Sequence, residues 1–502
     1  MNAPLNVLDN RHPAPELAAG EQSTQSGAPG GGGGKPAPVI QLDPRTYSRA
    51  LSCVHCGLCL PACPTYTETG NEADSPRGRI QLMRGLAEGN IQATDAVKKH
   101  LDLCLDCRGC ETACPSGVVY HELIEETRAR FAEQQRKRPE KRPGVEDRFL
   151  RWMFFNVFTR PTRLKLALLP ARVLQKIGAY ALLRKAGVMK LLPAQLRKME
   201  QMLPPEGNLW PRPLPERVID TGGSGFQPVL NELAESMGAK STGDRRQQQP
   251  TKRRPVVGFF PGCIGSVMFE SVNRQAVELL AASGAEVVTP RAAGCCGAIH
   301  HHNGEHHPAQ AMARHNIETF LPNDGGGVDY IATNIAGCGA MLREYDFLLR
   351  DDPAYHERAA EFSSRVRDIS EVLLELGLPV MKYAVEQTVT YHDACHLAHA
   401  QKVTQPPRQL LAQVPGIRLV ALPESDMCCG AAGTYNLQHP EMATSLATRK
   451  INNIASTGAS ICTTGNVGCA MHIGSEAAAK GATVRIVHPV ELLHFAVFGP
   501  PR

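Results

Sequence analysis

The chain has 502 residues, of which 42% are hydrophobic and 21% are charged, and this length and composition predict more than one well-packed domain. The formal net charge of +5 is small for that length, so nucleic acid is not expected as a partner. Seventeen cysteines without an apolar N-terminal signal segment predict a reducing, cytoplasmic compartment in which thiolates serve as ligands. The sequence has no run of 18 apolar residues, so no membrane-spanning helix is expected.

The N-terminal residues 1–41 are expected to form a disordered arm. They contain a glycine run, Gly30 to Gly34, followed by Lys-Pro-Ala-Pro. Such a composition cannot bury enough apolar surface to form a core.

Residues 42–135 contain two cysteine runs, each with the pattern C-x2-C-x2-C-x3-C-P. This is the spacing of bacterial ferredoxins, in which three close thiolates bind one [4Fe–4S] cluster and the fourth binds the other. Two clusters with crossed ligation are therefore expected. The first would be held by Cys53, Cys56, Cys59 and Cys114, and the second by Cys104, Cys107, Cys110 and Cys63.

Zinc sites and a disulfide framework are the alternatives for these eight cysteines. A third cysteine at short spacing, followed by Cys-Pro, fits zinc poorly, and disulfides are not expected without a secretory context. The 40 residues between the runs predict helices after Ser75 and over 95–103, so this domain should be a mostly helical ferredoxin module. Arg77, Arg79 and Arg108 could tune a cluster potential, or they could be solvated surface residues.

Residues 136–217 form a basic segment with ten Lys or Arg and no Asp or Glu between 160 and 199. Pro161, Pro170 and Pro193 are expected to divide it into short helices. Such a segment can lie on an anionic membrane, pack on a partner subunit or cover the protein's own core. Residues 218–254 are polar and of low complexity, which predicts a linker.

Residues 255–385 and 386–502 are two copies of one unit. The cysteines of the second copy follow those of the first by 131 to 133 residues, and each copy contains a Cys-Cys-Gly sequence. The cysteines of the first copy are Cys263, Cys295, Cys296 and Cys338. Those of the second are Cys395, Cys428, Cys429 and Cys469.

Short apolar strands alternate with helices in both copies, which predicts a parallel α/β fold. The expected strands lie at 256–260, 285–289 and 328–333, and at 388–392, 418–422 and 459–464. A loop with cysteine follows each strand, so the thiols of each copy should converge at the carboxyl edge of its sheet. A non-cubane cluster, a redox thiol pair and zinc are all considered, and Cys462 is expected to be a core thiol.

The histidine-rich stretch 299–307 follows Cys296, and solvated histidines are its default interpretation, with metal binding as the alternative. His392 and His396 flank Cys395 and could donate hydrogen bonds to its sulfur, or they could simply be polar loop residues.

In these motifs the chain resembles the iron–sulfur subunits of bacterial glycolate oxidases. The resemblance rests on Cys53-Val-His-Cys-Gly-Leu-Cys, Ser75-Pro-Arg-Gly-Arg-Ile, Ala293-Gly-Cys-Cys-Gly-Ala and Met427-Cys-Cys-Gly-Ala-Ala-Gly-Thr-Tyr, within a match that covers most of 45–495. The Cys-Cys-Gly duplication also resembles the thiol subunit of heterodisulfide reductase, the anchor subunit of anaerobic glycerol-3-phosphate dehydrogenase and lactate-utilisation proteins. In heterodisulfide reductase and lactate-utilisation proteins, a fuller C…CC…C-x2-C pattern can ligate non-cubane clusters. This sequence departs from that pattern, because Cys338 and Cys469 have no partner cysteine three residues away.

The resemblance implies an electron-transfer subunit of a glycolate oxidase complex, with FAD on a partner subunit and quinone at the membrane surface as a possible acceptor. The sequence itself has no G-x-G-x-x-G flavin motif between a strand and a helix. The alternatives are the same role in a lactate or glycerol-3-phosphate dehydrogenase, a thiol–disulfide enzyme like heterodisulfide reductase, and a membrane anchor for a flavoenzyme.

Overall fold

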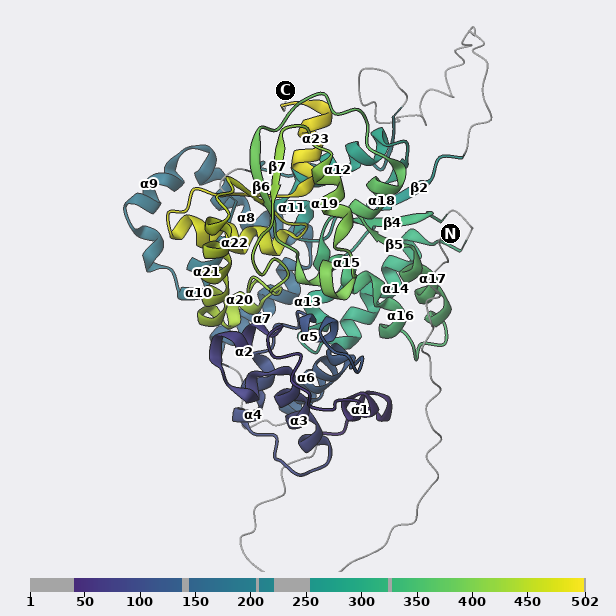
Figure 1. Ribbon diagram of the computed structural model, residues 1–502, viewed down its shortest axis with the longest axis vertical. Coiled ribbons are helices and arrows are strands. Elements are labelled where there is room, and N and C mark those ends of the chain that lie inside the picture. Colours follow the sequence, from purple (N-terminus) through teal and green to yellow (C-terminus); the bar gives the residue numbers. More distant parts are fainter. Residues whose placement is uncertain (1–39, 138–143, 205–206, 221–252, 324–326, 501–502) are drawn as a thin grey trace, which may run out of the picture. The chain divides into compact units, whose positions relative to one another are not determined.

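The computed structural model describes residues 40–137, 144–204, 207–220, 253–323 and 327–500 (Figure 1). The expected arm therefore lies outside the described residues except for its last two. Ile40 is one of these, and it is buried in the core of the module that follows. The expected linker lies mostly outside them as well, but its first residues join strand β1 (Arg217–Ile219).

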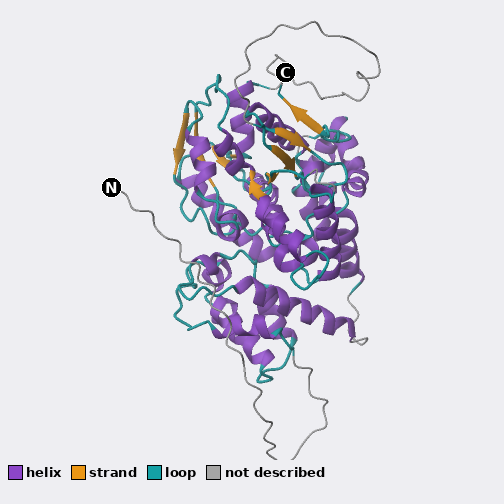
Figure 2. Ribbon diagram, turned by 90° about the vertical axis from the view of Figure 1, so that its right-hand side faces the viewer, coloured by secondary structure: helices purple, strands orange, loops and turns teal. Residues whose placement is uncertain are grey.

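The first module is built from helices and loops, and its described residues 40–137 contain no strand (Figure 2). Helix α3 begins where Ser75 accepts a hydrogen bond from Gly78 N and Pro76 occupies the first turn, as the sequence predicts. Apolar side chains of α1, α3, α4 and α6 form the core between the cysteine loops. The helices are α1 (Pro44–Leu51), α2 (Pro64–Thr69), η1 (Glu72–Asp74), α3 (Pro76–Ala87), α4 (Asp95–Asp102), α5 (Gly109–Thr112) and α6 (Tyr120–Lys137).

The basic segment is helical, but Pro170 does not divide it as expected. Pro170 lies inside α8, which continues to Lys176, and the chain turns instead at Gly178, where φ is +75°. Proline removes only one helical hydrogen bond, whereas the left-handed backbone at Gly178 ends the helix. The elements are α7 (Val145–Met153), η2 (Phe154–Phe158), α8 (Pro161–Lys176), α9 (Ala179–Lys185), η3 (Val188–Leu191) and α10 (Ala194–Gln201).

Two parallel sheets follow, one in each copy of the duplicated unit. The first has the order β1-β3-β2-β4-β5 and the second β7-β6-β8-β9, and only β1 runs antiparallel to its neighbour. The first-copy strands are β2 (Val256–Phe259), β3 (Glu286–Val288), β4 (Tyr330–Thr333) and β5 (Val366–Asp368). The second-copy strands are β6 (Gln387–Tyr391), β7 (Ile417–Val420), β8 (Ile461–Thr463) and β9 (Arg485–Val487).

The strand orders show that the two copies share one topology. When β2, β3, β4 and β5 are matched to β6, β7, β8 and β9, the two orders become identical. The expected duplicated parallel α/β fold is therefore confirmed, with a fourth strand in each copy that the sequence analysis did not single out. Cys462 lies in β8 and is fully buried, as expected for a core thiol.

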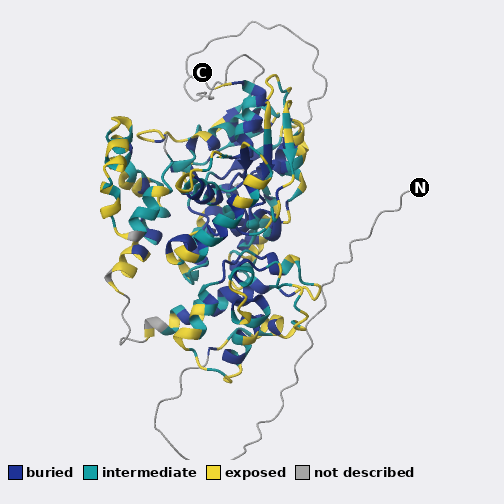
Figure 3. Cartoon of the chain, turned by 60° about the vertical axis from the view of Figure 1, so that its left-hand side comes forward, coloured by how far each residue is buried: buried dark blue, intermediate teal, exposed yellow. Residues whose placement is uncertain are grey.

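The helices of the two copies pack into one shared core. Helix α12 (Glu270–Ala282) packs on α23 (Pro489–Phe498), and α18 (Ile369–Leu376) packs on α19 (Gln405–Ala412). A single apolar cluster contains side chains from all four helices and from both sheets. Figure 3 shows the buried residues gathered around the sheets, with more exposure on the outer helices.

The remaining helices of the duplicated unit cover the sheets or carry the loops that follow the strands. In the first copy they are α11 (Gly265–Met268), α13 (Ala298–His301), α14 (His306–Phe320), α15 (Ala336–Arg343), α16 (Tyr345–Leu348) and α17 (His356–Arg365). In the second copy they are η5 (His396–Ala400), α20 (Tyr435–Gln438), α21 (Pro440–Ser456) and α22 (Val467–Ala479).

Candidate functional site

The eight cysteines of the helical module line two neighbouring cavities. One cavity is lined by Cys53, Cys56, Cys59 and Cys114, and the other by Cys63, Cys104, Cys107 and Cys110. Cys110 also reaches the wall of the first cavity. Because the last cysteine of each run lines the cavity of the other run, the arrangement is the crossed one that the spacing favours.

Each cysteine loop has left-handed backbone at the same two positions. In the first loop these are His55 and Gly57, and in the second they are Asp106 and Arg108, with φ between +52° and +85°. Such conformations are costly for residues other than glycine and persist only where the surrounding structure holds them. The loops are thereby curled around their cavities, and Asp106 N donates to Cys104 Sγ at 3.4 Å.

The chemistry of the two cavities fits iron–sulfur clusters. At least four cysteine sulfurs line each cavity, and burial raises the pKa of the Cys107 and Cys110 thiols well above its usual value. Those thiols stay protonated unless a metal displaces the proton, so metal binding and thiolate formation are coupled here. The carbon and sulfur lining of both cavities suits a group that needs thiolate ligands and little water.

The arginines near the runs have different environments. Arg77 is partly exposed and binds Glu72 and the carbonyl of His55, as a surface residue would. Arg79 is 1% exposed, its Nε donates to His100 O at 2.7 Å, and its Nη1 lies 4.0 Å from Cys63 Sγ. Arg108 is also buried and forms a bidentate ion pair with Glu344 of the first repeat. The solvated-surface interpretation therefore fits Arg77 only.

The four cysteines of the first repeat meet at the carboxyl edge of its sheet, as expected. Cys263 Sγ lies 3.5 Å from Cys295 Sγ, and Cys296 Sγ lies 3.4 Å from Cys338 Sγ. The adjacent cysteines of the Cys-Cys-Gly sequence thus face different partners within one site. Hydrogen bonds from Cys263 and Cys296 hold the pKa of the Cys295 thiol well below its usual value.

Two side chains that the sequence analysis did not identify hold this loop in place. Asn316 Nδ2 donates to Cys295 O at 2.9 Å, and Tyr345 Oη donates to Cys296 O at 2.8 Å. Both lie on helices far along the chain from the Cys-Cys-Gly sequence. No local sequence pattern marks such contacts.

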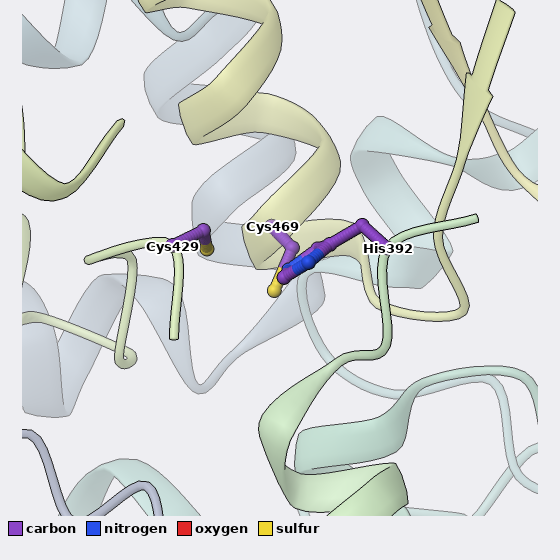
Figure 4. Close-up of side chains that lie close together, drawn as sticks. All are labelled: His392, Cys429 and Cys469. Carbon is purple, nitrogen blue, oxygen red and sulfur yellow. The ribbon is translucent and has the colours of Figure 1, made fainter. Parts of the chain in front are cut away.

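The second repeat gathers its cysteines in the same way and adds a histidine. Cys395 Sγ lies 3.9 Å from Cys428 Sγ, and Asn466 Nδ2 donates to Cys469 Sγ at 3.3 Å. His392, Cys429 and Cys469 place their ligand atoms within 4.8 Å of one another, and all three are buried (Figure 4).

The two histidines beside Cys395 bond to backbone carbonyls, and bonds to the Cys395 sulfur were only one of the two alternatives for them. His392 lies with Cys429 and Cys469, and its Nδ1 bonds to Ser425 O at 2.9 Å. His396 Nε2 bonds to Asp106 O at 3.1 Å. Both bonds are to residues far away in the sequence, which sequence neighbourhood could not reveal.

The second cysteine loop lies directly against the second repeat. Cys107 and Cys395 pack on one buried apolar cluster that contains Leu105, Cys428 and Tyr435. Tyr435 Oη donates to Leu103 O at 2.9 Å, which fixes this contact. The cavity of the second cysteine run therefore adjoins the thiols of the second repeat.

Part of the histidine-rich stretch is buried, contrary to its default interpretation, whereas His307 at its end is exposed. His300 and His301 are buried, and His301 Nε2 bonds to Glu125 Oε2 at 2.9 Å. The helix α13 turns this stretch inward onto α6. Polar residues can be buried where they face a second module, so a polar sequence alone does not predict exposure to solvent.

Family comparisons agree with this division of the chain. A 4Fe-4S dicluster domain model matches residues 49–118, and a model of the glycolate oxidase iron–sulfur subunit linker region matches residues 146–203. A cysteine-rich domain model matches twice, at residues 257–343 and 389–474.

Similar proteins extend over most of the chain. A probable glycolate oxidase iron–sulfur subunit of Bacillus subtilis is 38% identical over 449 residues, which are 88% of this chain and 93% of that protein. The glycolate oxidase iron–sulfur subunit of Escherichia coli is 31% identical over 84% of this chain and 89% of its own. Lactate utilization protein A of Halalkalibacterium halodurans is 32% identical over 47% of this chain and 96% of its own.

Proposed function

The chain belongs to the family of glycolate oxidase iron–sulfur subunits, and we propose that it carries electrons within a glycolate oxidase complex. The observation that supports this best is the pair of adjoining cavities, each lined by four cysteines, with the second set against the thiols of the second repeat. When bound, [4Fe–4S] clusters supply one-electron carriers, which divide the two-electron oxidation of glycolate to glyoxylate into single-electron steps.

We propose that each cluster is held by the first three cysteines of one run and the last cysteine of the other run. Cys53, Cys56, Cys59 and Cys114 would hold the first cluster, and Cys104, Cys107, Cys110 and Cys63 the second. The chain's own contribution is to fix the loops, to keep water from the buried ligands and to place Cys107 beside the second repeat. The substrate chemistry would belong to a partner subunit with FAD, which takes two electrons from glycolate and releases them singly.

The thiols of the two repeats are the proposed exit. In the first repeat two Sγ–Sγ distances of 3.5 and 3.4 Å bring four sulfur atoms together. In the second repeat Cys395 Sγ lies 3.9 Å from Cys428 Sγ, and the sulfurs of Cys429 and Cys469 lie within 4.8 Å of each other. Such groups of thiols suit a further metal–sulfur group or a redox thiol pair. Membership of the family alone does not decide between these, whereas iron and sulfide counts would. About eight iron and eight sulfide per chain would indicate that only the helical module holds clusters, and about twelve or more would add the repeats.

The acceptor is proposed to be quinone, with the subunit peripheral on the cytoplasmic face of the inner membrane. No single helix in the described parts of the chain is long and apolar enough to cross a membrane, although α8 and α9 pass that test together with an 87° bend between them. Ile177, Leu182 and Leu191 are 68%, 69% and 85% exposed within this basic region. An apolar surface among cations suits the headgroups of an anionic bilayer.

Binding to vesicles tests this location. The purified chain should sediment with vesicles of anionic lipid and less with neutral ones, and Leu182→Asp with Leu191→Asp should reduce that binding. Leu209→Asp, at an exposed apolar residue outside this helical region, serves as the control. Equal sedimentation of all three proteins would remove the membrane from the proposal and leave electron transfer untouched.

The electron-transfer proposal is tested by ligand variants in the assembled complex. Cys56→Ser and Cys114→Ser should alter one and the same EPR signal of the reduced protein, and Cys107→Ser and Cys63→Ser should alter the other. All four should slow electron flow from glycolate to an artificial acceptor. Unchanged flow in Cys56→Ser and Cys107→Ser would overturn the function, whereas signals that pair Cys63 with Cys56 would overturn the crossed ligation alone.

A further inference from the structure

A second set of ligand-type side chains lies beside the second cysteine cavity, which Asp106 also lines, where the helical module meets the first repeat. It comprises Asp106 of the second cysteine loop, Glu125 of α6 and His302 at the end of α13. One ligand atom from each lies within 4.8 Å of the others. Asp106 and Glu125 are only 4% and 3% exposed, so water cannot solvate these carboxylates freely.

Asp106 has an unusual environment for a buried carboxylate. Neither of its oxygens receives a hydrogen bond from any described residue. His302 Nδ1 lies 3.3 Å from Asp106 Oδ2, but the same nitrogen is bonded to Glu125 Oε1 at 2.9 Å. A buried polar group without a partner is destabilising and a charged one more so, and an unpartnered carboxylate therefore points to a missing ligand.

The charges of the surrounding groups lead to the same conclusion. Asp106, Glu125 and Glu344 contribute three carboxylates, and the buried cation among them is Arg108. Arg108 is turned towards Glu344, whose two oxygens it binds, and its guanidinium lies 3.6 Å from Glu125. The carboxylates therefore outnumber the buried arginine, and protonated histidines or a divalent cation can balance the excess.

The geometry favours the cation over the protons. A proton on His302 Nδ1 can form one good hydrogen bond and leaves Asp106 Oδ1 without a donor, whereas an ion between the three groups would bond to all of them. Ligands about 2.1 Å from a tetrahedral ion lie about 3.4 Å apart, close to the 2.9 and 3.3 Å seen here. His301 Nε2 bonds to Glu125 Oε2 at 2.9 Å and would orient that ligand from outside.

We propose that Asp106, Glu125 and His302 bind one divalent cation that is not part of an iron–sulfur cluster. Two carboxylates and one imidazole suit Mn²⁺, Fe²⁺ or Zn²⁺, because Mg²⁺ and Ca²⁺ prefer ligand sets made of oxygen alone and Cu⁺ prefers sulfur. The ion would join the second cysteine loop and α6 to the first repeat. It would thereby hold the loop that contains Cys104 and Cys107 against the repeats.

Metal and sulfide analysis of the full chain, purified without oxygen, tests the site. The sum of zinc, manganese and iron should exceed acid-labile sulfide by one ion per chain. His302→Gln and Asp106→Asn should lose this ion and keep the sulfide. His399→Gln is the matched control, because His399 is an interface histidine bonded to Thr112 and Asp426 O, away from the three ligands.

A titration with Mn²⁺ provides a second test. It does not require that the native ion survives purification, and it does not require that Asp106→Asn assembles its clusters. After dialysis against a chelator, the wild-type chain should bind one Mn²⁺, seen as loss of the free-ion EPR signal, and His302→Gln should bind at least tenfold more weakly. Absence of an excess ion together with absence of Mn²⁺ binding would overturn the proposal. Equal Mn²⁺ binding by wild type and His302→Gln would overturn it as well.

Discussion

Cys107 of the helical module and Cys395 of the second repeat pack on the same buried apolar cluster. The contact joins a cysteine of the second cavity to a thiol that lies 3.9 Å from Cys428. Because electron transfer weakens steeply with distance, this contact supports the proposed exit through the second repeat. The first repeat touches the same loop through Arg108 and Glu344 rather than through its thiols.

Substitution of Cys428 should slow the exit of electrons through the second repeat without removing the clusters of the helical module. Cys428→Ser is expected to keep both EPR signals of the helical module and to lower electron flow from glycolate to the acceptor at least tenfold in the assembled complex. Cys462→Ala is the control, because this thiol lies in β8 and is not one of the four thiols that follow the strands of the second repeat. Undiminished flow in Cys428→Ser would exclude the second repeat from the route.

Arg79 should raise the reduction potential of the second cluster. Its buried guanidinium lies 4.0 Å from Cys63 Sγ, and a nearby positive charge favours the more negative, reduced form of a cluster. Arg79→Gln should lower that midpoint by roughly 60 mV, a tenfold change in a one-electron equilibrium. An EPR-monitored redox titration measures it.

Arg77→Gln is the matched control for this titration, because Arg77 is more exposed and lines the first cavity rather than the second. It should leave the second midpoint unchanged, and Arg79→Lys should restore part of the loss. If Arg77→Gln and Arg79→Gln shift the second midpoint equally, burial of Arg79 has no role in tuning.

The two Cys-Cys-Gly glycines should differ in their tolerance of alanine. Gly297 and Gly430 have φ of +93° and +92°, so each alanine variant bears the left-handed backbone cost of about 1–2 kcal/mol. A Cβ at Gly430 would lie 2.7 Å from Ala443 O, whereas at Gly297 the nearest atom is 3.4 Å away. Gly430→Ala should therefore reduce the free energy of unfolding more than Gly297→Ala.

Denaturant unfolding of the two variants measures the difference. Gly458→Ala supplies the backbone cost alone, since φ there is +66° and a Cβ would meet nothing within 4 Å. Gly297→Ala should resemble this control. An equal loss for Gly297→Ala and Gly430→Ala would mean that α21 moves away from Gly430 at little cost.

His488 should make stability depend on pH. Burial lowers the pKa of this ring to about 4, and its two nitrogens are committed to Val490 N and Asn334 O, which requires the neutral form. The ordinary histidine pKa is about 6.5, so between about pH 6.5 and 4 the unfolded chain binds the extra proton. Stability from His488 is complete above this window and falls as the pH decreases through it, by up to about 1.4 kcal/mol per pH unit.

Denaturant unfolding at pH 7.5 and 5.5 tests this linkage. His488→Asn keeps a side-chain acceptor for the start of α23 but cannot titrate, so its loss of stability between the two pH values should be smaller than in the wild type. His472→Asn should act similarly, because burial lowers the pKa of His472 to about 4 as well. The same loss in wild type and His488→Asn would show that this ring does not titrate with unfolding.

Cysteine spacing and the strand–helix alternation were sufficient to predict much of this molecule. The two C-x2-C-x2-C-x3-C-P runs indicated two neighbouring sites, and the repeated Cys-Cys-Gly sequence indicated the duplication that the strand orders confirm. These inferences succeed because ligand spacing and hydrophobic periodicity are local properties. The break expected at Pro170 failed because a helix can lose one hydrogen bond and continue.

The contacts between modules were decided by the tertiary structure alone. Nothing local distinguishes buried Arg79 from more exposed Arg77, or predicts that the histidines after Cys296 meet Glu125 of α6. The position of Cys107 beside Cys395 likewise depends on how the second cysteine loop packs on the repeats. The sequence by itself determined which residues can bind metal, whereas long-range packing determined their burial, charge environment and neighbours, because those properties arise from residues far apart in the chain.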